Sequence, residues 1–340
     1  MRKIRIGNIG TLHDHSLGTM ETIKKCDDIF EIVGFVPESD ERYLAVKDTP
    51  AYRGVKRMTL DELFEARPDA MVIEGFETEQ VHAAQLCIDR GIHVQIDKPA
   101  GANAEEFEKL LSDAKKKHLV VHMGYMYRYN PSVMRVKELV KEGFFGDIYA
   151  VEAQMNCEHP IEKRDWLGNF RGGMTFFLGC HLVDLLFGIL GVPDEIIPLN
   201  RAIRPGTTAE DFGMALFRYP GGVSFFKSCA AEAGGFHRRQ LVVCGTKGTV
   251  EVKPLERNVE GFYLDSVMTT YRAEGRDWGV PGETVVYPPF HRYEAMLREF
   301  AACVRGEMEN PYSYEYELRL EMLLLASCGY PIDFKREIKL

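Results

Sequence analysis

The stretch Gly91-Ile92-His93-Val94-Gln95-Ile96-Asp97-Lys98-Pro99 decides the fold of this 340-residue chain. Its apolar run predicts a short strand, and Pro99 ends the strand because proline has no backbone N–H to donate. Open parallel sheets bind their ligands beyond the carboxyl ends of their strands. Lys98 follows this strand directly and is therefore a candidate site residue. The alternative is a solvent-exposed loop lysine, which is the commoner situation for lysine.

Outward from this stretch, apolar runs alternate with amphipathic segments. Strands are expected near residues 3–9, 31–36, 70–74, 93–97 and 119–123. Strands separated by helical patterns form βαβ units and hence a parallel sheet. From about residue 148 the strands become longer and alternating, with hairpin signals at Pro220-Gly221-Gly222 and Thr246-Lys247-Gly248. That pattern predicts a mostly antiparallel sheet, and residues 314–327 predict a helix near the carboxyl end.

We therefore predict an α/β fold with two domains. Residues 1–123 are expected to form a domain of the Rossmann type with a doubly wound parallel sheet. Residues 124–340 are expected to form an α+β domain with a large, mostly antiparallel sheet. The carboxyl-terminal helix is expected to pack back on the first domain.

Composition narrows the class of partner. The chain has 51 acidic and 42 basic side chains, for a net charge of -9. Proteins that bind nucleic acid usually carry a basic excess, so we expect no nucleic-acid partner. No apolar run approaches the length that spans a bilayer, so we expect neither a membrane segment nor export. Eight scattered cysteines without a Cys-x-x-Cys pair are typical of reduced thiols in the cytoplasm.

A second segment, Arg171-Gly-Gly-Met-Thr-Phe-Phe-Leu-Gly-Cys-His-Leu-Val-Asp184, is a glycine-rich approach to a lone His181. Together with Asp97-Lys98-Pro99 it resembles the glucose-fructose oxidoreductase and inositol dehydrogenase (Gfo/Idh/MocA) family. Members carry Glu-Lys-Pro after a strand and Gly-Gly-x-x-x-x-Asp-x-Gly-x-His at the first helix of the second domain. Residues 124–131 and 240–252 fit the family too. The resemblance implies a nicotinamide-dependent dehydrogenase that forms a homo-oligomer, a dimer or a tetramer. It also implies that the Rossmann domain, residues 1–123, binds NAD(P) and that residues 124–340 bind substrate and mediate oligomerisation.

The cofactor loop departs from the family pattern. The family has Gly-x-Gly-x-x-Gly/Ala after its first strand, and this chain has Gly10-Thr11-Leu12-His13-Asp14-His15. Only the first glycine is kept, so Leu12 and His15 must shift the loop or weaken binding. The helix that follows still offers free N–H groups to a pyrophosphate, with Ser16 as its expected cap. His13 or His15 could donate to a pyrophosphate, whereas Asp14 would repel one.

We expect NAD as the cofactor, with NADP less favoured. Glu38 is the acid nearest the end of the second strand, where it would bind the ribose hydroxyls and repel a 2′-phosphate. Its alternative is a turn residue in a polar loop. His82 is expected to be packed rather than catalytic. The cofactor-binding residues are predicted to be Gly10, Thr11, Leu12, Glu38, Phe76, Glu77, Asp97, Lys98 and Trp166.

Hydride transfer from a carbinol needs a base for the hydroxyl proton and a cation or donor for the developing charge. The resemblance implies that His181 is the base and that Lys98 binds the substrate oxygen. The family's aspartate four residues before this histidine is Phe177 here, so a substitute acid could come from Glu158, His159 or Asp165. A metal bound by Glu158, His159, His181 and Asp184 has no compact ligand spacing, and we predict no metal.

The family favours sugars, polyols and glycosides, so we predict reaction at a secondary hydroxyl of such a ring, with no phosphate clamp. The expected substrate-binding residues are Tyr127, Asn130, Asn156, His159, Arg164 and Asp165, with Trp166 and Arg171 nearby. Two alternatives stay open. In the first, the protein is a redox-assisted lyase or glycosidase, because Phe177 replaces an acidic residue of the family's acid–base group. In the second, it is a catalytically impaired binding or assembly subunit, because the glycine motif is degenerate.

Overall fold

The computed structural model describes residues 2–273, 275, 279 and 281–340, which divide into two compact units. The first contains the residues up to Tyr125, Tyr293–Glu321 and Ile338–Leu340. The second contains Met126–Arg292 and Met322–Glu337. Helix α10 (Tyr314–Ser327), which has the bounds expected from the sequence, contributes residues to both. No helix of the described residues is both long enough and apolar enough to cross a bilayer.

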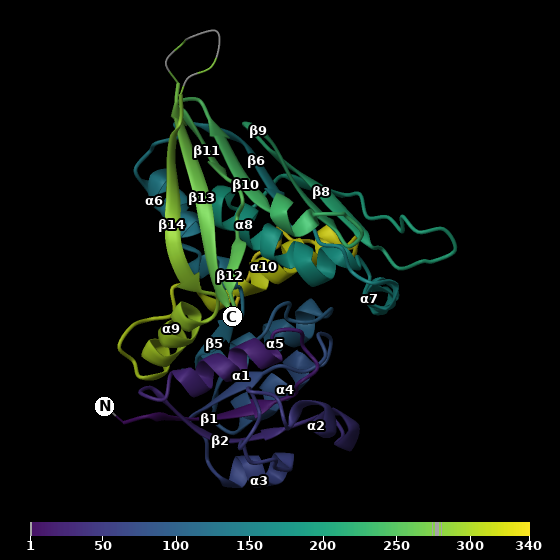
Figure 1. Cartoon of the computed structure of the whole chain (residues 1–340), viewed down its shortest axis with the longest axis vertical. Coiled ribbons are helices and arrows are strands. Elements are labelled where there is room, and N and C mark those ends of the chain that lie inside the picture. The colour runs from purple at the N-terminus through teal and green to yellow at the C-terminus, as the bar shows by residue number, and fades with distance from the viewer. Residues whose placement is uncertain (1, 274, 276–278, 280) are drawn as a thin grey trace. The chain divides into compact units, whose positions relative to one another are not determined.

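The first unit is built on a five-stranded, wholly parallel sheet with the order β2-β1-β3-β4-β5. Figure 1 labels β1, β2 and β5 of this sheet. The strands are β1 (Ile4–Ile9), β2 (Phe30–Val36), β3 (Ala70–Ile73), β4 (His93–Ile96) and β5 (Val121–Met123). All five lie where the sequence predicts them, which confirms the α/β class. The strand order reverses between β1 and β3, and open sheets bind ligands in the crevice at such a switch point.

The helices of the first unit pack through apolar faces with defined ends. They are α1 (Ser16–Lys25), α2 (Asp40–Val46), α3 (Leu60–Glu65), α4 (Gln80–Asp89), α5 (Ala104–Lys116) and α9 (Glu294–Val304). The Asn103 side chain caps α5 by accepting from the N–H groups of Glu105 and Glu106. Phe107 and Leu110 on that helix are buried, so its amphipathic pattern fixes which face meets the core.

The second unit contains a nine-stranded sheet with the order β12-β13-β11-β10-β6-β9-β8-β7, and β14 pairs with β13. All its pairs are antiparallel except β6 with β9. The predicted hairpins are confirmed, because Tyr219 pairs with Gly222 and the other turn joins β10 to β11. The bounds are β6 (Ile148–Gln154), β7 (Glu195–Pro198), β8 (Phe212–Tyr219), β9 (Gly222–Cys229), β10 (Gln240–Gly245), β11 (Gly248–Val252), β12 (Arg257–Glu260), β13 (Tyr263–Arg272) and β14 (Glu283–His291).

Helices also belong to this unit. They are α6 (Pro131–Lys141), α7 (Ile161–Trp166) and α8 (Cys180–Leu190), with short helical turns η1 (Met126–Tyr129), η2 (Leu167–Asn169) and η4 (Gly235–Arg238). A π-helical turn, η3 (Thr175–Gly179), runs directly into α8. Leu182, Val183 and Leu185 of α8 are fully buried, so this helix forms part of the core of the unit.

A buried carboxylate beside the sheet holds a charged network together. Glu256 accepts from Tyr127 Oη at 2.8 Å and pairs with Arg239 and Arg292. Burial alone would raise the pKa of Glu256, but Arg292 and Arg239 lower it to about 2. A carboxylate with a depressed pKa stabilises the fold at neutral pH and stops doing so when it is protonated.

We expect Glu256→Gln to destabilise the second unit by about 3–5 kcal/mol at pH 7, since it leaves the buried guanidinium of Arg239 and the partly buried guanidinium of Arg292 without their carboxylate. The wild-type contribution is complete above the ordinary value of 4.5 and is lost as pH falls toward about 2. Urea unfolding from pH 7 to pH 3 should therefore show the gap between wild type and variant closing. The exposed Glu260→Gln serves as control, and a gap that is constant with pH would contradict the assignment.

Candidate active site

The loop after β1 keeps its glycine for a steric reason. Gly10 has φ +85°, and a Cβ there would lie 2.4 Å from the backbone of Gly75 after β3. The loop then passes through buried Thr11 and exposed Leu12 into α1. The expected cap is wrong: His15 occupies the N-cap position, and Ser16, one residue inside the helix, donates its hydroxyl to the Thr11 carbonyl.

Glu38, just beyond β2, binds this loop directly. Its Oε1 accepts the backbone N–H groups of Thr11 at 2.8 Å and Leu12 at 3.0 Å, and its Oε2 accepts the Thr11 hydroxyl at 3.0 Å. Arg42 Nε donates to the Thr11 carbonyl at 3.1 Å. The backbone N–H groups of the loop therefore face an anion, as expected for a segment that binds phosphate and ribose oxygens.

A pocket of about 300 Å³ opens at the carboxyl ends of β1, β2 and β3. It is lined by Gly10, Glu38, Gly75 and His82, among others, and its volume falls at the small end of ligand sites. His82 is exposed, so the expectation that it packs is wrong: its position on α4 faces solvent beside this pocket. Gly10 and Glu38 thus meet at one concave surface, which fits the adenosine end of a dinucleotide.

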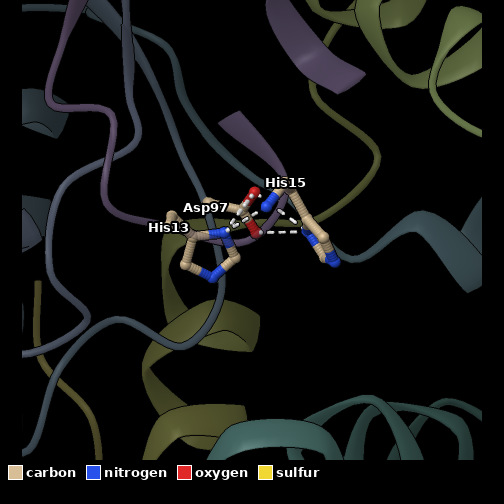
Figure 2. Close-up of side chains that lie close together, drawn as sticks. All are labelled: His13, His15 and Asp97. Carbon is tan, nitrogen blue, oxygen red and sulfur yellow. Dashed lines mark hydrogen bonds and ion pairs between the residues drawn. The ribbon is translucent and has the colours of Figure 1, made fainter. Parts of the chain in front are cut away.

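Two histidines of the loop converge on the acid that ends β4 (Figure 2). The Oδ2 atom of Asp97 lies 3.2 Å from His13 Nδ1 and 3.0 Å from His15 Nδ1. Figure 2 shows the two rings on opposite sides of this carboxylate. A third acid, Glu74 at the end of β3, places Oε2 at 3.7 Å from His13 Nδ1. The parallel sheet brings these groups together because β1, β3 and β4 all end at this edge.

Burial sets the protonation of this cluster. Burial lowers the pKa of His15 to about 4, so its imidazole is neutral at pH 7. Burial and the neighbouring Asp97 raise the pKa of Glu74 well above its usual range. Burial also disfavours ionised Asp97, but His13 and His15 hold its pKa well below the usual range. The two carboxyl groups thus differ, with Asp97 as the ionised one.

Lys98 is fully buried, so the alternative of a solvent-exposed lysine is wrong. Its backbone N–H donates to Asp97 Oδ1 at 2.6 Å, and its carbonyl lies 3.0 Å from His13 Nε2. Glu77 is buried with Oε1 3.9 Å from His13 Nε2, and Phe76 is half-buried before it. The predicted residues Gly10, Thr11, Leu12, Glu38, Phe76, Glu77, Asp97 and Lys98 therefore all lie at the carboxyl edge of the first unit's sheet.

His181 lies in the second unit at the start of α8, where it is 1% exposed. Its ring packs edge-on against Tyr127, with 5.3 Å between centroids. Asp184, one turn on, accepts from Arg128 at 2.8 Å and so forms a buried ion pair. This ion pair gives Asp184 a local structural role.

The position of the missing family aspartate is filled by an aromatic cluster. Phe177 packs edge-on against Trp166, with 5.1 Å between centroids, and its ring lies 6.4 Å from that of His159. The Lys163 ammonium lies 3.5 Å from the Trp166 ring centre and 4.4 Å from that of Phe177. A cation and aromatic faces thus stand where the family has a carboxylate.

The remaining residues predicted to bind substrate differ in their hydrogen-bond and ion-pair partners. Asn130 caps α6 and also donates to the Leu255 carbonyl, so both its polar atoms have protein partners. Arg164 pairs with Asp211 at 2.6 Å, and Asp165 pairs with Arg204.

Asn156 is different, because its buried Oδ1 has no hydrogen-bond partner among the described residues. A buried amide oxygen in that state is suited to accept a hydrogen bond from a ligand hydroxyl.

Sequence reasoning missed two groups. Glu74 was not singled out, although it ends a strand at the same sheet edge as Asp97. The Glu256 network was also missed, because nothing in the local pattern pairs Glu256 with arginines at positions 239 and 292.

Comparison with known proteins agrees with this architecture. Residues 4–125 match the model of the oxidoreductase family with an NAD-binding Rossmann fold, and residues 133–251 match the GFO/IDH/MocA C-terminal domain. The chain is 28% identical over 269 residues to mouse trans-1,2-dihydrobenzene-1,2-diol dehydrogenase, covering 75% of each chain.

Of two other similarities, the first is limited in the length that it covers and the second in sequence identity. The chain is 27% identical to scyllo-inositol 2-dehydrogenase (NADP(+)) IolW of Bacillus subtilis, over 37% of this chain and 36% of that enzyme. The WlbA dehydrogenase of Bordetella pertussis, solved with NADH and UDP-GlcNAcA, superposes with a TM-score of 0.76 at 20% identity, over 98% of this chain and all of the other. The last likeness supports the fold alone. From the two family matches, the chain belongs to the Gfo/Idh/MocA family of oxidoreductases and is an NAD(P)-dependent dehydrogenase.

Proposed function

We propose that the protein transfers a hydride between NAD and a secondary hydroxyl carbon of a sugar, polyol or glycoside. The observation that carries the proposal is the buried Lys98 at the carboxyl end of β4, the edge at which parallel sheets bind ligands. The names of the two sequence relatives support the substrate class, since each refers to a ring with hydroxyl groups.

Each retained residue has a role in this proposal. His181 takes the hydroxyl proton, which moves electron density toward the carbinol carbon as the hydride leaves. The Lys98 ammonium hydrogen-bonds the substrate oxygen and stabilises its developing negative charge. Asn156 Oδ1 accepts from a ring hydroxyl, and Trp166 offers an aromatic face. The nicotinamide, when bound, supplies the hydride acceptor or donor.

Turnover with a panel of polyols, free sugars and glycosides tests the proposal. The protein is mixed with NAD or NADP, and reduced nicotinamide is followed by its absorbance. We expect reduction with at least one cyclic secondary alcohol and none with matched deoxy rings. Reduction by open-chain primary alcohols alone would contradict the substrate class.

The cofactor preference is assigned to Glu38. We expect Glu38→Gln to weaken NADH binding by about 3–10-fold and to strengthen NADPH binding, because glutamine still accepts from the loop N–H groups but no longer repels a 2′-phosphate. Arg42, which lies beside Thr11, would then favour that phosphate. Fluorescence titration of both cofactors measures the ratio, with the exposed Glu41→Gln as control. An unchanged ratio would show that Glu38 does not set the preference.

A second candidate reaction is a redox-assisted lyase or glycosidase. Transient oxidation of a hydroxyl acidifies a neighbouring C–H, a leaving group departs, and the hydride returns. The specific observation is the aromatic and cationic environment at Phe177, which alters the acid–base set of the family. Analysis of products from aryl glycosides decides: release of the aglycone without net NADH formation supports this reaction, and intact glycoside excludes it.

A homo-oligomer, dimer or tetramer, is part of the same proposal. Exposed apolar side chains on strands of the large sheet support it, namely Tyr149, Val223, Tyr263, Val285 and Val286. Light scattering on the purified protein measures the mass, and a monomer at all concentrations would remove this part. The cytoplasmic location remains a prediction.

A further inference from the structure

We infer that His13, His15, Asp97 and Glu74 form a binding site for one divalent transition-metal ion such as Zn²⁺. One ligand atom from each of His13, His15 and Asp97 lies within 4.8 Å of the other two, and all three residues are buried. The proposal departs from the sequence analysis, which considered a metal only in the second unit. It concerns the first unit alone and does not depend on the proposed substrate.

The hydrogen atoms of His13 can be assigned from its neighbours. Nε2 lies 3.0 Å from the Lys98 carbonyl oxygen, which can only accept, so Nε2 carries the proton. Nδ1 accepts the backbone N–H of His15 at 3.2 Å, so it presents its lone pair. An imidazole that donates through one nitrogen to a backbone carbonyl and offers the other is the usual state of a metal-binding histidine.

The Nδ1 atom of His13 and the carboxylate of Asp97 need a proton or a metal ion between them. Nδ1 of His13 lies 3.2 Å from an oxygen of the ionised Asp97 carboxylate, Oδ2, and 3.7 Å from Glu74 Oε2. Glu74 Oε2 has no hydrogen-bond partner among the described residues. Lone pairs that face each other in a buried site repel unless a proton or a metal ion lies between them.

The spacing fits a tetrahedral ion. Bonds of about 2.0–2.1 Å place neighbouring ligand atoms roughly 3.3 Å apart around tetrahedral Zn²⁺. The separations of 3.0 Å, 3.2 Å and 3.7 Å in the cluster bracket this value. Two imidazoles and two carboxylates are also a donor set that first-row metals bind well. The weak contact between His15 N–H and His13 Nδ1 would give way to the ion.

An ion here would lock the loop after β1. It would tie residues of that loop to Glu74 after β3 and Asp97 after β4, in a segment where the glycines of the family are absent. The ionised Asp97 carboxylate favours a cation in this cluster, and metal binding would release the proton of Glu74, whose pKa is raised by burial and by Asp97. We assign the ion a structural role in holding the cofactor loop.

The test uses the untagged full-length protein, since a histidine tag would bind metal. The protein is stripped with a chelator, then titrated with Zn²⁺ by calorimetry and with Co²⁺ by visible absorption. We expect one ion per chain with a micromolar or tighter Kd, tetrahedral Co²⁺ bands, and a higher Tm after Zn²⁺ is added. His15→Gln should weaken Zn²⁺ binding at least 10-fold, and the exposed His118→Asn should not.

Direct measurements on wild type keep the test decisive even if a variant folds poorly. Wild-type protein that binds no more Zn²⁺ than the His13→Gln/His15→Gln double variant overturns the inference. An unchanged Tm of the wild-type protein after Zn²⁺ is added also overturns the inference. A shared proton, and not a metal ion, would then lie between the side chains of the cluster.

Discussion

Lys98→Met is expected to lower turnover of the best alcohol substrate by about 10³-fold, within the range that a positioned acid, base or charge contributes. Methionine keeps most of the length and volume of the buried side chain but removes the ammonium group. Because that charge is proposed to stabilise the oxygen of the reacting carbinol, the loss should appear chiefly in kcat. Steady-state kinetics and an NADH titration on the same preparation separate the two effects.

The exposed lysine Lys116→Met is the matched control and should retain wild-type kinetics. A Lys98→Met enzyme that binds NADH normally and turns over within about three-fold of wild type would remove Lys98 from the reaction, since an acid–base or charge contribution is far larger than that. A variant that loses NADH binding as well would place Lys98 in cofactor binding.

His181→Gln is expected to reduce turnover by about 10²–10⁴-fold through loss of the base. Glutamine preserves hydrogen-bonding capacity but cannot take up a proton near neutral pH. NADH affinity should stay close to wild type, because His181 is not among the residues predicted to bind the cofactor. Rapid mixing with saturating NAD and alcohol measures the hydride-transfer step.

The pH profile distinguishes a base from a structural histidine. Wild-type kcat/KM should rise with pH through one ionisation, and that ionisation should vanish in His181→Gln. The exposed His237→Gln should keep it. A profile that survives in His181→Gln would assign the base to another group, with His159 as the next residue to replace.

The sheet of the first unit was predictable because its signals are local. Mainly apolar runs mark the strands, which have three to seven residues, and the βαβ pattern indicates that the strands are parallel. The two hairpins were predictable for a similar reason, since the turns at Pro220-Gly221 and Thr246-Lys247 follow alternating strands. Local pattern and final fold agree at these places.

Contacts across the sheet edge were not predictable in the same way. His13 and His15 were treated as ligands of a pyrophosphate, but the structure brings both to Asp97, more than eighty residues later. Glu38 was expected at a ribose, and its carboxylate also binds the loop backbone. Such pairs depend on the strand order β2-β1-β3-β4. That order cannot be deduced from the spacing of residues along the sequence.

Two smaller errors have a common origin in helix geometry. Ser16 comes just before the helical pattern of α1 and was therefore expected to be the N-cap. His15 occupies that position instead, and the Ser16 hydroxyl donates to the Thr11 carbonyl. His82 lies among apolar residues in sequence, yet its place on α4 faces solvent. A shift of one position along a helix rotates a side chain by about 100°, so local sequence constrains the facing of a residue weakly.

The measurement that tests the central claim most directly is titration of the nucleotide-stripped protein with NADH and NADPH. Nicotinamide fluorescence reports binding, and Tm reports linkage to folding. Saturable binding of both, tighter for NADH, is the predicted result, and it would show that a loop with only Gly10 of the usual glycines holds a dinucleotide. No binding and no rise in Tm with either cofactor would contradict the account.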